Sequence, residues 1–199
     1  MTKIKLCGLT RECDIEYANE LAPDYIGFVF AEKSKRYVTP EKACLLRRKL
    51  SGGIIPVGVF VNEAPDFIAD LLTQNIIDAV QLHGTEDEEY IRNLRKLTDR
   101  PIIKAFRIET ETDVEAANKS SADYVLLDSG GGTGTVFDWA LLKDIKRPYF
   151  LAGGLTPENV SKAIKMLSPF GVDVSSSLET DGFKDKNKMA AFTAAVRKD

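Results

Sequence analysis

The chain has 199 residues, of which 44% are hydrophobic and 29% are charged, and its formal net charge at pH 7 is −3. This length suits one domain with a sizeable core or two small ones, and the composition is typical of a globular protein. The balanced charge excludes the basic surface that nucleic-acid binding requires, and no apolar run approaches the roughly 18 residues of a membrane span. We therefore expect no nucleic-acid partner and no membrane partner.

The three cysteines, at positions 7, 13 and 44, form no regular disulfide framework. An odd count without such a framework favours a reducing compartment. The N-terminus lacks the long apolar core of a signal peptide, so we expect a cytoplasmic protein. The single histidine and the scattered cysteines show no zinc-ligand spacing, so no metal site is predicted.

Short β-branched apolar runs alternate with helical patterns along the chain. The predicted strands are, in chain order, Lys3–Cys7, Tyr25–Phe30, Ile54–Phe60, Ala79–Leu82, Pro101–Ala105, Tyr124–Leu127, Tyr149–Leu151 and Gly171–Val174. The predicted helices are, in the same order, Arg11–Leu21, one starting at Thr39-Pro40-Glu41, Pro65–Thr73, Glu86–Leu97, Thr112–Asn118, Trp139–Ile145 after a capping Asp138, one starting at Thr156-Pro157-Glu158, and Asp185–Val196. Such alternation predicts parallel pairing with right-handed crossovers.

Eight strand–helix units can close into a single (β/α)8 barrel domain, the TIM barrel, over residues 1–199. The chain is short for this fold, which usually needs about 250 residues, so the loops and helices have to be short. A doubly wound open sheet is the alternative, because counting units does not prove closure.

Active sites of such barrels lie at the C-terminal ends of the strands, where Cys7 and Asp128 are predicted. The Cys7 thiolate is a candidate base or nucleophile, with a buried, inert cysteine as the alternative. Asp128, at the rim of an apolar core, is partly desolvated and suits a general acid, with a loop-bonding aspartate as the alternative. Cys13 and Cys44 fall in helical stretches and are expected to be structural.

Two loops are candidates for binding a phosphate group. Gly153 and Gly154 follow the seventh predicted strand, and Ser175 and Ser176 follow the eighth, which are the loops that often hold phosphate in these barrels. Their backbone amides near helix starts would be the donors, with two capped tight turns as the alternative. The segment Gly130–Gly134 lacks the Lys-Ser/Thr ending of a nucleotide-binding loop, and it is a candidate ligand contact or lid.

Three further polar residues lie at the expected working face. Arg36 ends a positive run, 33–36, after the second strand, and it could bind a carboxylate bidentately. His83 ends the fourth strand, where a lone histidine is more often structural than functional. Asp173 is a candidate helix cap, site residue or support for the site, and the sequence does not decide between these roles.

Taken together, the motifs at these positions resemble the phosphoribosylanthranilate isomerase family of tryptophan biosynthesis. The matching stretches keep the family order and cover nearly the whole chain: KLCGLT (5–10), GFVFAEKSKR (27–36), GVFVN (58–62), VQLHG (80–84), LLD (126–128), GTGTVFDW (132–139), AGGLTPENV (152–160) and VDVSS (172–176). Each motif is weak alone, and the set is specific.

The resemblance implies a (β/α)8 barrel that converts N-(5-phosphoribosyl)anthranilate into 1-(2-carboxyphenylamino)-1-deoxyribulose 5-phosphate by an Amadori rearrangement. By the family pattern, Asp128 is the general acid, Cys7 is the general base and Arg36 holds the anthranilate carboxylate. The loops at 153–154 and 175–176 hold the phosphate. A phosphorylated small molecule is thus the expected partner, no metal or redox cofactor is required, and we expect a monomer, with a dimer as the alternative.

One departure from the family pattern is Ser177, where relatives commonly have glycine. If that position needs a positive φ, a serine there costs about 1 kcal/mol in strain. Two other functions stay open. A phosphate-binding lyase could use Lys104 at the end of the fifth strand, and a non-catalytic binder could share the fold.

Overall fold

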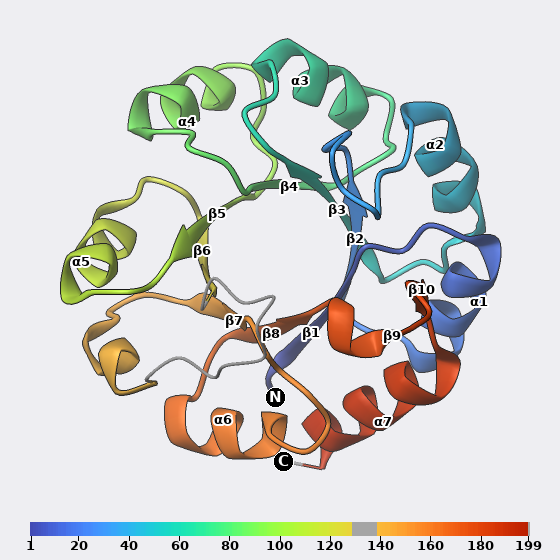
Figure 1. The fold of residues 1–199 in the computed structure, drawn as a ribbon. Helices are drawn as coiled ribbons and strands as arrows, with labels where there is room; N and C mark the ends of the chain where they lie inside the picture. Colours follow the sequence, from blue (N-terminus) through green and yellow to red (C-terminus); the bar gives the residue numbers. More distant parts are fainter. Residues whose placement is uncertain (129–138, 199) are drawn as a thin grey trace.

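The computed structural model describes residues 1–128 and 139–198, and its strands form a closed barrel surrounded by helices (Figure 1). The eight strands pair in the order β1 to β8, and β8 pairs with β1 in parallel from Lys3↔Gly171 to Leu6↔Val174. The (β/α)8 barrel is therefore confirmed, and the open-sheet alternative is wrong. Closure gives each strand two hydrogen-bonded neighbours, so the sheet has no unpaired edge.

All eight predicted barrel strands are present, most of them with boundaries shifted by one or two residues. The barrel strands are β1 Lys3–Cys7, β2 Tyr25–Val29, β3 Ile55–Phe60, β4 Ala79–Leu82, β5 Ile102–Arg107, β6 Tyr124–Asp128, β7 Tyr149–Ala152 and β8 Gly171–Val174. The helices of the described residues are α1 Glu12–Leu21, α2 Pro40–Lys49, α3 Pro65–Thr73, α4 Glu88–Arg95, α5 Glu111–Lys119, the 3-10 helix η1 Trp139–Asp144, α6 Val160–Leu167, the 3-10 helix η2 Ser176–Leu178 and α7 Lys186–Arg197. No helix among these described segments is both long and apolar enough to span a membrane.

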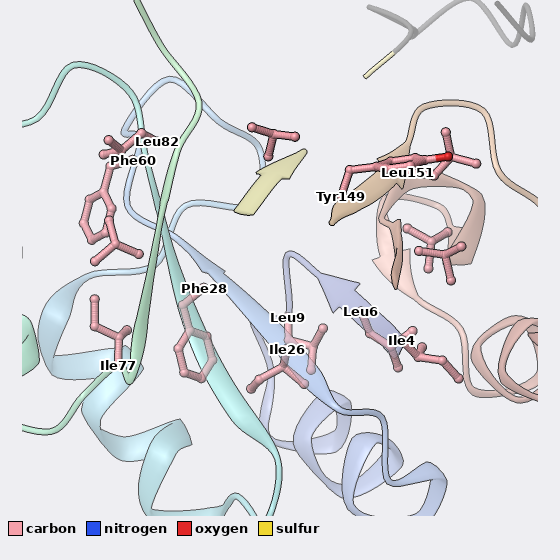
Figure 2. Packing of buried hydrophobic residues seen from close by; sticks show 14 of the residues in the cluster. Ile4, Leu6, Leu9, Ile26, Phe28, Phe60, Ile77, Leu82, Tyr149 and Leu151 are labelled. Atoms are coloured by element: carbon pink, nitrogen blue, oxygen red, sulfur yellow. The ribbon is translucent and has the colours of Figure 1, made fainter. Parts of the chain in front are cut away.

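The barrel strands are buried on both faces, and alternate residues on each strand face opposite sides. Outward-facing side chains such as Leu6, Ile26 and Phe28 pack under the helices in the main core cluster, as Figure 2 shows. Inside the N-terminal half of the barrel, Phe150 packs edge-on against Tyr25 and belongs to a second apolar cluster. This cluster packs inside the barrel, and a cavity opens beyond it towards the C-terminal ends of the strands.

Two predicted helix starts are wrong, and side-chain hydrogen bonds explain both. Helix α4 starts at Glu88 rather than Glu86, because Asp87 caps it by accepting from Tyr90 N. The Thr156-Pro157-Glu158 stretch forms a turn, and α6 starts only after Asn159, whose Oδ1 accepts from Thr156 N at 2.8 Å. By contrast, Thr39 caps α2 as predicted by accepting from Lys42 N.

A small hairpin after β8 was not predicted. Strands β9 (Glu179–Thr180) and β10 (Phe183–Lys184) pair antiparallel, with Glu179 opposite Lys184, beside α7 (Figure 1). The turn uses Asp181 and Gly182, both with positive φ, of 52° and 81°. The glycine-rich segment Gly130–Gly134 and the capping role of Asp138 lie outside the described residues.

Candidate active site

A cavity of about 630 Å³ lies at the C-terminal ends of the barrel strands. Its lining includes every predicted site residue: Cys7, Arg36, His83, Asp128, Gly153, Gly154, Asp173, Ser175 and Ser176. These residues come from β1, β6, β8 and the segments directly after β2, β4, β7 and β8. The fold thus assembles one site from segments that are far apart in the sequence.

Cys7 ends β1, and two glycines shape the space around it. Cys7 pairs with Gly27 on β2, where a Cβ would lie only 2.6 Å from the Cys7 Sγ atom. Gly8 has a φ of 80°, and a Cβ there would collide with the stem of Arg36. A side chain at either glycine would therefore displace the thiol or the guanidinium.

The charges around Cys7 act in opposite directions on its thiol. Burial raises the pKa of Cys7 above its ordinary value, the charge of Lys5 lowers this pKa, Asp173 raises it and Lys184 lowers it. Lys5 Nζ donates to Asp173 Oδ1 at 2.7 Å, and the Lys5 side chain is fully buried. Burial outweighs the nearby cations, so the pKa of Cys7 lies above its ordinary value and the thiol form is favoured at neutral pH.

Asp128 ends β6, separated from β1 by β7 and β8 in the closed barrel. Its Oδ2 lies 3.9 Å from His83 Nε2, and burial lowers the pKa of His83 below its ordinary value. A neutral imidazole is therefore expected at neutral pH. Gln81 Nε2 lies 2.9 Å from His83 Nδ1, which fits a donated hydrogen bond that leaves the His83 proton on Nε2, facing Asp128.

Arg36 has a partner within the protein that the sequence did not predict. Its Nε and Nη2 atoms donate to the two carboxylate oxygens of Glu179 at 2.5 and 2.8 Å. Glu179 also accepts from Lys184 Nζ at 2.6 Å. Hydrogen bonds from Arg36 and Lys184 hold the pKa of Glu179 below its ordinary value despite partial burial. One edge of the planar guanidinium is thus occupied by Glu179, and the remaining N–H groups can bind a ligand.

The loops after β7 and β8 have the geometry of an anion site. Gly153 and Gly154 have φ values of 84° and 64°. Among the described residues, no hydrogen-bond acceptor is found for the N–H groups of Gly153, Gly154 and Ser176. Consecutive amides that lack acceptors and line one cavity suit a phosphate group.

Ser177 does not have the strained backbone that its difference from the family pattern suggested. Its φ lies outside the left-handed region, because the residue is in the middle of η2. Its hydroxyl donates to Leu155 O at 2.6 Å and so links the loop after β8 to the loop after β7. The expected strain penalty is therefore absent, and the serine adds a bond that glycine cannot make.

Lys104 does not line the cavity. Its Nζ donates to Gly84 O at 2.7 Å and to Glu86 Oε2 at 2.8 Å, and Glu86 accepts further from Asn62 N. This buried ion pair fixes the loop after β4 next to His83. A lysine held in this way is poorly placed to form an imine with a substrate, which argues against a lyase.

Sequence reasoning missed four polar residues around the site: Lys5, Gln81, Glu179 and Lys184. Lys5 and Gln81 were detectable, because each interrupts an apolar strand at a position that faces the barrel interior. Glu179 and Lys184 depend on the β9–β10 hairpin, for which the sequence offers only the Asp-Gly turn at 181–182.

The chain was also compared with known proteins. A family model described as N-(5'phosphoribosyl)anthranilate (PRA) isomerase matches residues 4–195. Relatives named N-(5'-phosphoribosyl)anthranilate isomerase from Caldanaerobacter subterraneus subsp. tengcongensis and Endomicrobium trichonymphae are each 46% identical. Both alignments cover 99% of this chain, and they cover 98% and 99% of the relatives.

Solved structures agree with the sequence relatives. The phosphoribosyl anthranilate isomerase of Thermotoga maritima superposes with a TM-score of 0.90 at 39% identity, over 100% of both chains. A phosphoribosyl anthranilate isomerase in complex with reduced 1-(o-carboxyphenylamino)-1-deoxyribulose 5-phosphate superposes with a TM-score of 0.88 at 38% identity, also over 100% of both chains. The similarity therefore extends over the whole barrel.

Proposed function

The chain belongs to the N-(5'-phosphoribosyl)anthranilate isomerase family, and we propose that Cys7 is its general base and Asp128 its general acid. The family reaction is the Amadori rearrangement of N-(5-phosphoribosyl)anthranilate to 1-(2-carboxyphenylamino)-1-deoxyribulose 5-phosphate in tryptophan biosynthesis. Because hydrogen moves only within one molecule and to or from solvent, the reaction is redox-neutral overall and needs no redox cofactor.

The first step opens the ribose ring. Asp128 gives a proton to the ring oxygen, the C1–O bond breaks, and the anthranilate nitrogen supplies the electron pair that forms a Schiff base. His83 Nε2, 3.9 Å from Asp128 Oδ2, is close enough to stabilise the resulting carboxylate through a short movement or a bridging water. A neutral His83 with its proton on Nε2 cannot accept the proton that Asp128 gives to the ring oxygen.

The second step removes the C2 proton. The Cys7 thiolate accepts this proton, and the C2 electrons move towards the iminium nitrogen to give an enolamine. Tautomerisation then places a hydrogen on C1 and a ketone at C2, so the product is an aminoketose. General acid–base steps of this kind typically contribute 10²- to 10⁴-fold each.

Two groups are suited to hold the ends of the substrate. Arg36 keeps N–H donors free beyond the pair it makes with Glu179, and a carboxylate such as that of anthranilate fits them. The amides of Gly153, Gly154 and Ser176, together with Ser175, suit the 5-phosphate. Asp173 accepts a hydrogen bond from Lys5 and so helps to fix the part of the cavity beside Cys7.

One observation supports these roles above the others. Cys7 and Asp128 enter one cavity from different strands, and the amide-lined loops after β7 and β8 open into the same cavity. A base, an acid and an anion site around one space are what an isomerase of a phosphorylated sugar derivative requires.

Anthranilate-type fluorescence tests the function. Phosphoribosylanthranilate is generated in situ, and its fluorescence is followed with and without the protein. We expect the protein to accelerate the loss of fluorescence and to yield the aminoketose. Folded protein that gives no acceleration would contradict the function. Trapping of a Lys104 imine by borohydride would instead support the lyase.

Ser177→Ala tests the link between the two phosphate loops. Loss of the bond to Leu155 O weakens the phosphate-binding arrangement of the two loops by about 1 kcal/mol. KM and the inhibition constant of inorganic phosphate are therefore expected to rise about fivefold, with kcat nearly unchanged. Ser161→Ala is the matched control, because its hydroxyl donates to Ala195 O at 3.0 Å away from the cavity. If KM and the phosphate inhibition constant of the Ser177→Ala variant equal those of the wild type, the bond to Leu155 O does not contribute to phosphate binding.

The cellular compartment and the oligomeric state of the protein are also proposed. A biosynthetic enzyme with free cysteines is consistent with the cytoplasm. The Thermotoga maritima isomerase is dimeric, and for this chain we keep the monomer as the prediction and the dimer as the alternative. The phosphorylated small molecule is the proposed partner.

A further inference from the structure

Lys5 lies on the inner face of β1, two residues before Cys7 and on the same side of the strand. Its side chain has no exposed surface. A fully buried lysine is rare in proteins, because removing an ammonium group from water is costly unless the charge is compensated. The position of Lys5 therefore needs an explanation beyond packing.

Asp173 compensates Lys5 only in part. The two residues are direct neighbours in the β1–β8 pairing, and Lys5 Nζ donates to Asp173 Oδ1 at 2.7 Å. The side chain of Cys7, two residues further along the inner face of β1, is the second group whose charge acts on Lys5. Burial alone would lower the pKa of Lys5, but Asp173 and Cys7 raise it above its ordinary value. Lys5 is therefore a cation that donates to the Asp173 carboxylate and lies on the same face of β1 as the Cys7 thiol.

The other charged groups near Cys7 balance one another. Arg36, from the segment after β2, and Lys184, on β10, share the carboxylate of Glu179 on β9. Lys5, Arg36 and Lys184 thus face the carboxyl groups of Asp173 and Glu179 and, across the cavity, that of Asp128. His83, directly after β4, lines the same cavity, and burial lowers its pKa below the ordinary value. Of the three cations, Lys5 is the one that shares both the strand and the inner face with Cys7.

We propose that Lys5 is a positioning residue that stabilises the thiolate form that Cys7 needs for proton abstraction, against the opposing effect of burial, and that Asp173 limits this stabilisation by sharing the ammonium. This inference rests on the proposed role of Cys7 as the base. The step is an ionisation: the S–H bond breaks, the proton leaves to solvent and the sulfur keeps the electron pair beside the Lys5 ammonium.

A purely structural role for Lys5 makes a different prediction. If Lys5 only neutralised Asp173, removing either residue would destabilise the barrel without a directed change in the reactivity of Cys7. If Lys5 stabilises the thiolate, the two removals act in opposite directions. Lys5→Met raises the pKa of Cys7, and Asp173→Asn lowers it because the Lys5 ammonium then has Cys7 as its main partner.

The test is the pH profile of alkylation at Cys7 by iodoacetamide in the full chain. Mass spectrometry of the Cys7 peptide reports its rate, and the Cys44 peptide in the same digest is the internal reference. We expect the Lys5→Met midpoint to move up by at least one pH unit, with at least tenfold slower alkylation at pH 8. We expect the Asp173→Asn midpoint to move down.

Lys3→Met is the matched control. Lys3 lies on the same strand, its side chain is 45% exposed and it pairs with Asp24 away from the cavity. Its removal takes the same charge from β1 and leaves the Cys7 profile unchanged. A midpoint in the Lys5→Met variant that matches the wild type overturns the proposal.

If the Lys5→Met variant does not fold, the Asp173→Asn profile decides, and a midpoint that stays constant or rises overturns the proposal. The alkylation result does not depend on turnover. Full activity of a Cys7→Ala variant would therefore refute the proposed base separately from the Lys5–Cys7 interaction.

Discussion

Cys7→Ala is expected to reduce kcat by about 10²- to 10⁴-fold, because no other group replaces the thiolate that removes the C2 proton. KM is expected to change little, since the substrate is held by its carboxylate and phosphate ends. The variant should fold, because Cys7 lies at the end of β1 beside an open cavity and its removal leaves no unpaired polar group.

The measurement is the decay of phosphoribosylanthranilate fluorescence at saturating substrate, with circular dichroism as the check of folding. Cys44→Ala is the matched control, because Cys44 is a half-buried cysteine on α2, away from the cavity. Activity of the Cys7→Ala variant within a few-fold of the wild type would remove Cys7 from the mechanism while leaving the isomerase function possible.

The fold was predictable because its determinants are local and repeated. Each barrel strand is a short β-branched run, and each is followed by a helical stripe or a cap, as in Thr39 accepting from Lys42 N. Closure was not predictable from the residues alone. It depends on the register between Lys3–Leu6 and Gly171–Val174, residues that no local pattern connects.

The site was predictable where strand ends determine it. Cys7 and Asp128 terminate strands and His83 directly follows one, and the parallel barrel brings all such ends to one face. The pairing of Arg36 with Glu179 was not predictable, since two segments that are distant in sequence meet only after the β9–β10 hairpin folds. Side-chain pairs of this kind depend on tertiary geometry, which the pattern of one sequence does not specify.

Asp128→Asn is expected to lower kcat by about 10²- to 10⁴-fold, because the amide keeps the shape of the carboxyl but cannot give a proton to the ring oxygen. Asp78→Asn is the matched control. Asp78 lies at the opposite end of the barrel, and its side chain is 25% exposed, against 27% for Asp128. Equal losses in both variants would indicate a general effect on stability rather than the loss of an acid.

The double variant Cys7→Ala/Asp128→Asn tests whether the two groups act in successive steps. If Asp128 serves ring opening and Cys7 serves the later proton abstraction, each substitution raises a different barrier, and the higher barrier alone limits the rate. The double variant should then turn over about as slowly as the slower single variant, as expected for groups whose effects are not additive. Losses that multiply would mean that acid and base act in one transition state, and the separate Schiff-base intermediate would have to be abandoned.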